Sequence, residues 1–135
     1  MNTKEQIKLN FDSYEFYGKE IIKKEKEFFT EFDRVIELEQ WDKLNKVIEM
    51  GRSYLMLSQR FLVEIDGIQE QIPILFDELR KAQGDKWRGD DAIHRSYSKT
   101  VEGTRKMQKA IHKKMVMELE MLERLRKDNG YGSYE

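Results

Sequence analysis

The side chains that could hold a metal ion or carry out acid–base chemistry are few in this chain. His94 and His112 are the only histidines among 135 residues, and there is no cysteine. A di-iron carboxylate site in a helical bundle needs two Glu-x-x-His motifs, because that spacing places a carboxylate and an imidazole on one helix face. Asp91 precedes His94 at this spacing, but Lys109 occupies the matching position before His112. We therefore predict no metal site, and we expect both histidines to face solvent.

Motifs that cradle phosphate or present a nucleophile are also missing. The chain contains no Gly-x-x-x-x-Gly-Lys-Ser/Thr, Gly-x-Gly-x-x-Gly or Gly-x-Ser-x-Gly sequence. Glutamates recur four residues before lysines, as in Glu20–Lys24 and Glu39–Lys43, which is a spacing typical of solvated helix surfaces. The sequence therefore predicts no catalytic residue, no cofactor-binding residue and no enzymatic activity.

A basic run in the C-terminal part of the chain could in principle contact nucleic acid. It consists of Arg105, Lys106, Lys109, Lys113 and Lys114, with no acidic residue between positions 103 and 117. A nucleic-acid site would need more positive charge and nearby aromatic side chains on which bases can stack. The run has neither, and the net charge of the chain is −1. We therefore interpret it as a solvated helix face and predict no nucleic-acid partner.

Apolar side chains recur with 4-3 spacing through the N-terminal part of the chain, which is the period of a helix that packs in a bundle. The ladder consists of Ile7, Phe11, Tyr14, Gly18, Ile21, Glu25, Phe28, Phe32 and Val35. Gly18 and Glu25 interrupt it, and glycine inside a helix costs about 1 kcal/mol relative to alanine unless close packing requires it. The pattern predicts a helix over about residues 3–38.

A tight corner should follow this helix. Trp41 can cover the corner with its ring, and Asp42 can cap the next helix by accepting backbone N–H bonds. The second helix is predicted over about residues 42–71, where Gly51 and Ser58 leave room for bulky side chains of the first helix. Because Pro73 has no backbone N–H, we expect a kink or restart there, followed by a separate short segment over residues 73–82.

Gly84–Asp91 reads as a loop, residues 91–127 as the third long helix, and residues 128–135 as a short tail. Residues 1–135 are thus predicted to form a single all-α domain, an elongated antiparallel bundle of three long helices with coiled-coil-like packing. The polar start of the chain lacks a signal-peptide core, and no run approaches the ~18 apolar residues of a membrane helix. We expect a soluble, cytoplasmic protein without a membrane span.

A methionine-rich run near the end of the third helix offers a candidate binding surface. Val116, Met117 and Met121 remain after the core positions of this helix have been assigned. Because methionine is flexible and polarisable, such a face suits a groove that accepts a partner helix. The alternative is a wide core stripe that packs between the two other helices.

The second helix also carries a family resemblance. It opens on Trp41, Asp42 and Leu44 and continues with Glu49, Arg52, Tyr54 and Leu55. This stretch resembles the start of the second helix in the FliT/FlgN class of flagellar type III export chaperones. The resemblance implies a chaperone that binds the C-terminal helical part of an export substrate, largely through its own C-terminal helix. The partner-binding face that it implies here is Met115, Met117, Leu119, Met121, Leu122 and Leu125.

Two alternative functions remain at this point. The chain could be a structural coiled-coil module whose apolar stripes are all used in a homo-oligomer, of which a homodimer is the simplest form. It could also be a secreted protein, since Trp87-Arg88-Gly89 resembles the Trp-x-Gly corner of small secreted helical-hairpin proteins.

Overall fold

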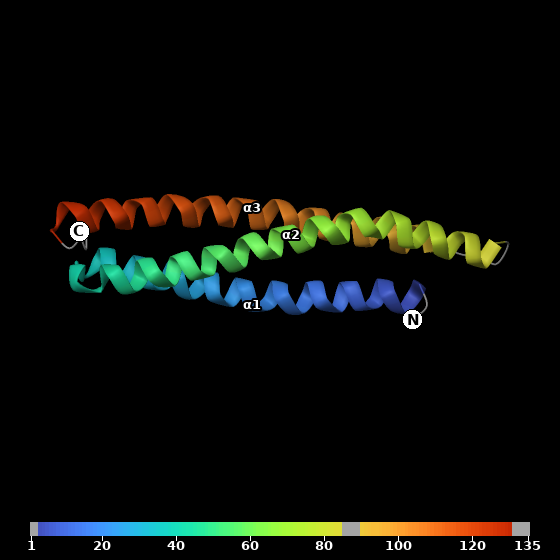
Figure 1. The fold of residues 1–135 in the computed structure, drawn as a ribbon, viewed down its shortest axis with the longest axis horizontal. Coiled ribbons are helices and arrows are strands. Elements are labelled where there is room, and N and C mark those ends of the chain that lie inside the picture. The colour runs from blue at the N-terminus through green and yellow to red at the C-terminus, as the bar shows by residue number, and fades with distance from the viewer. Residues whose placement is uncertain (1–2, 85–89, 131–135) are drawn as a thin grey trace.

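The chain forms three long helices that lie side by side in an elongated bundle, shown in Figure 1. The computed structural model describes residues 3–84 and 90–130. Helix α1 spans Thr3–Glu37, α2 spans Leu44–Gln83 and α3 spans Asp90–Asp128, and a short 3-10 turn, η1, occupies Trp41–Lys43. Helix α2 packs against both of the other helices and runs antiparallel to each (Figure 1). The predicted all-α bundle is confirmed.

The α1 ladder faces the core as its spacing predicts. Every ladder position from Tyr14 to Val35 is buried, including the two interruptions, Gly18 and Glu25. A methyl group added at Gly18 would lie 3.2 Å from the ring of Phe61 on α2, so close helix packing explains this glycine. Glu25 has a different role, which is described with the polar layer below.

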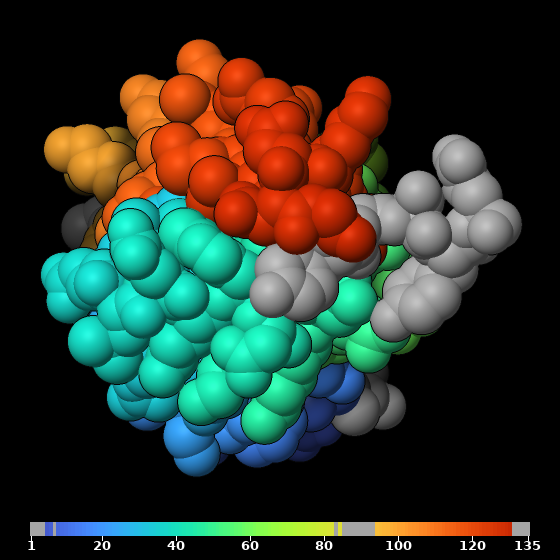
Figure 2. Space-filling view, turned by 90° about the vertical axis from the view of Figure 1, so that its left-hand side faces the viewer, coloured from blue at the N-terminus to red at the C-terminus, as the bar shows by residue number. Residues whose placement is uncertain are grey.

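The corner between α1 and α2 is formed differently from the prediction. Trp41 is half-buried against the neighbouring core, as expected. Asp42, however, caps no helix: it lies inside η1, and α2 starts two residues later, at Leu44, whose backbone N–H bonds to the carbonyl of Trp41. The 3-10 turn thus supplies a carbonyl acceptor for the first backbone N–H of α2, so a side-chain cap is not required there. Figure 2 views the molecule from this end, with the start of α2 beneath the last turns of α3.

The predicted break at Pro73 is wrong, because α2 is a single helix of 40 residues with Pro73 inside it. A proline costs about 3 kcal/mol in a helix interior, since it removes one hydrogen bond and crowds the preceding turn. Burial of the apolar side chains around it outweighs that cost. The buried residues of this segment are Ile72, Leu75, Phe76 and Leu79.

The apolar core has two parts. The corner cluster lies near η1 and includes Phe28, Val35, Leu44, Ile48, Met115 and Leu122. The distal cluster lies towards the other end and includes Tyr14, Ile21, Phe61, Ile65, Phe76 and Val101. Between them, each helix contributes a buried polar side chain.

Three predicted features fall partly or wholly outside the described residues. Residues 85–89 of the predicted loop, with the Trp87-Arg88-Gly89 motif, lie outside them, as do residues 131–135 of the predicted tail. Asp90 and Asp91, at the predicted end of the loop, belong to α3. Within the described parts of the chain, no helix is long and apolar enough to cross a membrane.

Candidate functional site

The six residues of the predicted partner-binding face do not share one accessible surface. Met115, Leu119 and Leu122 are buried in the corner cluster, where they pack against α1 and α2. Leu125 is half-buried against the same cluster. Met117 and Met121 remain exposed, at 59% and 44%. The prediction is therefore wrong for the buried three, because their 4-3 spacing directs them inward whereas residues 117 and 121 fall on the outer side of α3.

The surface around Met117 and Met121 is shallow and belongs to one helix. A hollow of about 400 Å³ is lined there by α3 alone, with Lys113, Lys114 and Arg124 among its walls. The ammonium group of Lys114 lies 4.3 Å from the ring centroid of Phe29, so one of these cations already covers an aromatic face. A docked helix would find no second wall at this surface.

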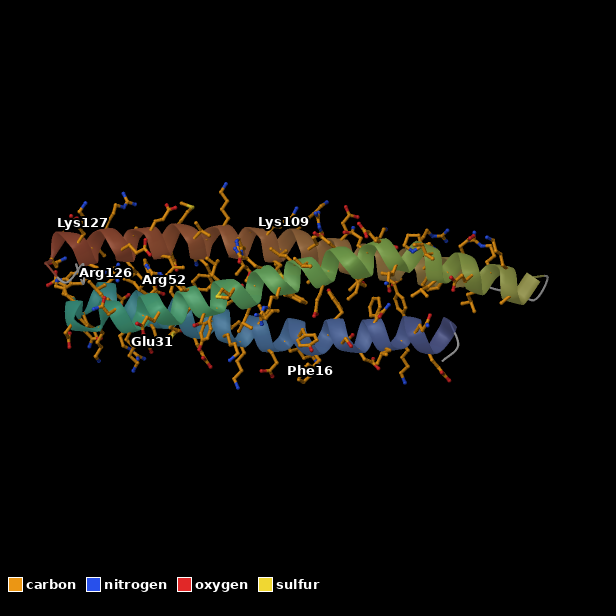
Figure 3. All side chains as sticks on the ribbon, viewed as in Figure 1. Phe16, Glu31, Arg52, Lys109, Arg126 and Lys127 are labelled. Atoms are coloured by element: carbon orange, nitrogen blue, oxygen red, sulfur yellow. The ribbon has the colours of Figure 1, made fainter. Side chains whose placement is uncertain are left out.

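A two-walled groove lies instead between α1 and α2. It has a volume of about 400 Å³ and a largely apolar lining. Ile21 and Phe61 are buried at its floor, while Tyr17 and Leu57 form the walls. Phe16 borders the groove with 62% of its surface exposed, and Figure 3 shows it projecting from α1 at the outer edge of the bundle. We call this feature the α1–α2 groove.

Both walls of the α1–α2 groove follow helical spacing. Besides Phe16, the lining residues of α1 are Tyr17, Glu20, Ile21 and Lys24, and those of α2 are Leu57, Arg60, Phe61 and Glu64. Each set follows an i, i+3, i+4, i+7 pattern, which forms a continuous stripe along a helix. Each stripe also carries one acidic and one basic side chain. The groove therefore combines an apolar floor with a rim of mixed charge.

A second hollow continues the same α1–α2 seam towards the start of α1. Leu9 and Ile74, which are 50% and 58% exposed, line it together with Asn10 and Gln71. The amide of Asn10 donates to the side-chain oxygen of Gln71 at 3.3 Å and links the two helices at this level. From Leu9 to Lys24 the seam runs along roughly 23 Å of α1, at ~1.5 Å per residue.

Sequence reasoning does not identify the α1–α2 groove. The 4-3 ladder of the first helix includes neither Phe16 nor Tyr17. The adjacent aromatic residues Phe16 and Tyr17 are the one sign of this groove in the sequence. Neighbouring side chains on a helix point in different directions, so Phe16 and Tyr17 cannot both face the core. Which α2 residues face them depends on the register between the two helices, which one-dimensional periodicity does not determine.

A buried polar layer separates the two apolar clusters. The amide of Gln108 on α3 donates to Glu25 Oε2 on α1 at 2.7 Å and to Ser58 Oγ on α2 at 2.9 Å. Ser58 Oγ also lies 3.2 Å from His112 Nδ1. Glu25 is 2% exposed, and its Oε1 atom has no hydrogen-bond partner. Burial raises the pKa of Glu25 to about 7, although the hydrogen bond from Gln108 acts in the opposite direction.

The polar layer pairs a serine with a histidine, but it does not form a catalytic arrangement. Ser58 is completely buried, so a substrate cannot reach its hydroxyl. Neither Ser58 nor His112 lines the α1–α2 groove, and Gln108 stands between the carboxylate and the serine. The arrangement fits a cross-link between three helices better than nucleophilic catalysis, in which a base must activate an accessible nucleophile.

The expected solvent-facing position of both histidines is also wrong. His112 is half-buried beside Ser58, and the half-buried ring of His94 stacks on Phe76 with the ring centroids 4.6 Å apart. Their contacts are with side chains of the bundle. Across residues 3–84 and 90–130, no group of three or more His, Cys, Asp or Glu side chains is placed to hold a metal ion.

We find no significant match of this chain to a protein-family model, to a curated protein or to a solved structure.

Proposed function

We propose that this protein is a non-enzymatic helical adaptor or chaperone that binds an amphipathic helix of a partner protein in the α1–α2 groove. One observation carries the proposal: aromatic and aliphatic side chains of two helices line an open groove and are not covered by the rest of the described chain. Phe16 and Tyr17 are 62% and 46% exposed there. Large exposed apolar surfaces with a polar rim are typical of interaction sites.

The shape of the groove favours a helix as its occupant. Two helical stripes side by side form a channel into which the side-chain ridge of a third helix can pack. The seam from Leu9 to Lys24 would accommodate about four turns of such a helix, at ~5.4 Å per turn. The partner is expected to present apolar residues at i, i+3, i+4 and i+7 towards Tyr17, Ile21 and Leu57.

The charges at the rim restrict the flanks of the partner helix. The α1 wall carries one acidic residue, Glu20, and one basic residue, Lys24. The α2 wall likewise carries Arg60 and Glu64. A helix with residues of both signs beside its apolar stripe can pair with both walls, whereas a uniformly charged helix would meet a like charge on each wall. An amphipathic helix of mixed charge is therefore the preferred partner.

The resemblance of about residues 20–65, which include the Trp41–Leu55 stretch, to flagellar export chaperones supports a more specific form of the proposal. In this form the partner is a flagellar or other type III export substrate, which the protein holds in the cytoplasm before delivery. The binding site that we propose differs from the one that the resemblance implied, because Met115, Leu119 and Leu122 belong to the core.

Two variants test where a partner binds. We expect Phe16→Glu with Tyr17→Glu to weaken partner binding by at least about tenfold, since each change places a charge on the apolar wall. The matched control is Met117→Glu with Met121→Glu, which adds the same charges to the outer side of α3. A photo-crosslinking residue at position 16, used in the native host, would identify the partner segment. The affinity of a synthetic peptide of that segment would then be measured by fluorescence anisotropy.

The proposal predicts that the crosslinked segment is an amphipathic helix and that its peptide binds the wild type and the α3 variant equally well. Circular dichroism would verify that both variants stay folded. Peptide binding that survives the groove substitutions and is lost with the α3 substitutions would place the site on the methionine surface instead. A crosslinked segment without helical amphipathicity would contradict the proposal altogether.

A further inference from the structure

The outer side of α2 carries a second apolar ladder, separate from the one that faces the core. Met56, Val63 and Ile74 are 58%, 71% and 58% exposed. Together with Arg60, Gly67 and Glu70, all of them exposed, they follow the 4-3-4-3-4 spacing of a coiled-coil seam. No other element of the described chain covers this side of α2. We call these six residues the outer ladder.

Gly67 is the least explained residue of the outer ladder. Glycine in an exposed helix interior costs about 1 kcal/mol relative to alanine. Packing inside the chain accounts for Gly18 and Gly51, since an added methyl group would lie 3.2 Å from Phe61 or 2.5 Å from Phe28. At Gly67 an added methyl group would meet no atom within 4 Å. Nothing in the bundle therefore requires glycine here, whereas a second helix that approached α2 closely at this level would.

The positions of the outer ladder are symmetric about Ile65, and the residues at matching distances are complementary in size and charge. Met56 and Ile74 each lie nine residues from Ile65, Arg60 and Glu70 each lie five, and Val63 and Gly67 each lie two. When two copies of α2 are laid antiparallel and centred on Ile65, Met56 faces Ile74 of the other copy and Arg60 faces Glu70. Val63 then faces Gly67, so a branched side chain fills the space that the glycine leaves.

We propose that α2 pairs with α2 of a second copy of this chain, antiparallel and centred on Ile65, through the outer ladder. A twofold interface uses the same patch on both partners, so a self-complementary ladder is what such an interface requires. Two copies would form six layers: two of Met56 with Ile74, two of Val63 with Gly67 and two Arg60–Glu70 ion pairs. Neither Arg60 nor Glu70 forms an ion pair within the described chain. Both are therefore available to the second copy.

The charges also determine the direction of the pairing. In a parallel pair in register, Arg60 would face Arg60 and Glu70 would face Glu70, and like charges at such positions are unfavourable. In the antiparallel pair each arginine meets a glutamate. This inference concerns the chain by itself and holds whether or not the α1–α2 groove binds a partner, although Arg60 and Ile74 border both the outer ladder and the α1–α2 seam.

Charge reversal and restoration test the proposal without disturbing the core. Sedimentation velocity over a dilution series of the protein alone would measure the dimer dissociation constant. We expect Arg60→Glu and Glu70→Arg each to raise that constant by about tenfold or more, because each creates two like-charge layers. The double variant Arg60→Glu with Glu70→Arg restores both pairs, and its dissociation constant should return to within a few-fold of the wild type.

Two further variants complete the test. Val63→Glu should give a monomer, because it places a charge against the glycine of the second copy. Lys109→Glu is the matched control, since Lys109 points away from the bundle on the outer side of α3 (Figure 3), and the dimer should not change. A wild type that stays monomeric at all concentrations would overturn the proposal. So would a dimer that survives Val63→Glu, or a double charge swap that dimerises no better than either single variant.

Discussion

Helix α2 has an inner face, which packs against α1 and α3, and an outer face, which carries the outer ladder. Apolar side chains recur with the same helical spacing on both faces, but only the inner face is covered by the rest of the described chain. On the inner face, Ile48, Phe61 and Ile65 are at most 2% exposed, packed against α1 and α3. On the outer face, Met56 and Val63 follow the same spacing and stay more than half exposed. Each face also holds a glycine. A methyl group added at Gly51 would overlap side chains of two other helices, whereas one added at Gly67 would meet no atom within 4 Å.

This difference shows what periodicity alone can establish about a helix. A 4-3 apolar ladder indicates that a face is built to be covered, but it does not say whether the covering element belongs to the same chain. The inner face of α2 is covered by α1 and α3 of the same chain. The outer face and the adjoining α1–α2 groove expose large apolar side chains that no element of the described chain covers, so they are where we place the second copy and the partner helix.

The polar layer interrupts the apolar core at the inner face of α2, and Glu25→Gln should show what the buried carboxylate of this layer costs in stability. The pKa of Glu25 is about 7 in the folded chain against an ordinary value of 4.5. The native state therefore holds this proton more tightly than the unfolded chain, and stability is lost as pH rises from about 4.5 to about 7. At pH 8 the loss amounts to roughly 3 kcal/mol. We expect the variant to gain up to that amount at pH 8 and little at pH 4, measured by urea unfolding.

A control separates Glu25 from the other groups of the layer. His112→Gln removes the imidazole beside Ser58 and leaves the carboxylate, so the variant should keep the loss of stability between pH 5 and pH 7. Burial also raises the pKa of Glu118, so a weaker pH dependence of the same sign should persist in Glu25→Gln. A wild type that becomes more stable from pH 5 to pH 8 would rule out the buried carboxylate as the main source of the pH dependence.

Gly51→Ala should damage the inner face. The added methyl group would lie 2.5 Å from Phe28 Cε1 and 2.6 Å from Leu119 Cδ2, and both of those side chains are buried. Overpacking of a core costs about 1–3 kcal/mol, and the higher helix propensity of alanine offsets about 1 kcal/mol of it. A net loss of up to about 2 kcal/mol is expected from the urea midpoint at constant slope. Increased stability would mean that the three helices are not packed closely at this level.

Much of the fold could be predicted from the sequence because local signals and burial agree along most of the chain. The ladder from Tyr14 to Val35, the approximate bounds of α1 and α3 and the accommodation of Phe28 at Gly51 all follow from spacing and side-chain size. The exceptions are places where tertiary packing overrides a local rule. Pro73 stays inside α2 because its neighbours are buried, and Asp42 is not a cap because a 3-10 turn precedes the helix.

The candidate sites were less accessible to sequence reasoning, because they depend on which residues of different helices share a level. Gln108 is polar, so an apolar ladder does not include it, yet it joins Glu25 to Ser58 and is 1% exposed. Tyr17 and Leu57 form one groove only because α1 and α2 pack in a particular register. The outer ladder could be read from the sequence, but only the structure shows that no other described element covers it.

Gly67→Ala gives the smallest expected effect and compares the two faces directly. In the Val63→Glu background, which should be monomeric, alanine should stabilise the bundle by about 1 kcal/mol through helix propensity, since its methyl group meets no other atom. In the wild-type background the same methyl group would occupy the space that faces Val63 of the second copy. There we expect the dimer dissociation constant to rise even though each chain is more stable. Stability from urea unfolding and association from sedimentation velocity should thus change in opposite directions. If both improve, the outer glycine does not serve a close helix contact, and the cover of this face must be sought elsewhere.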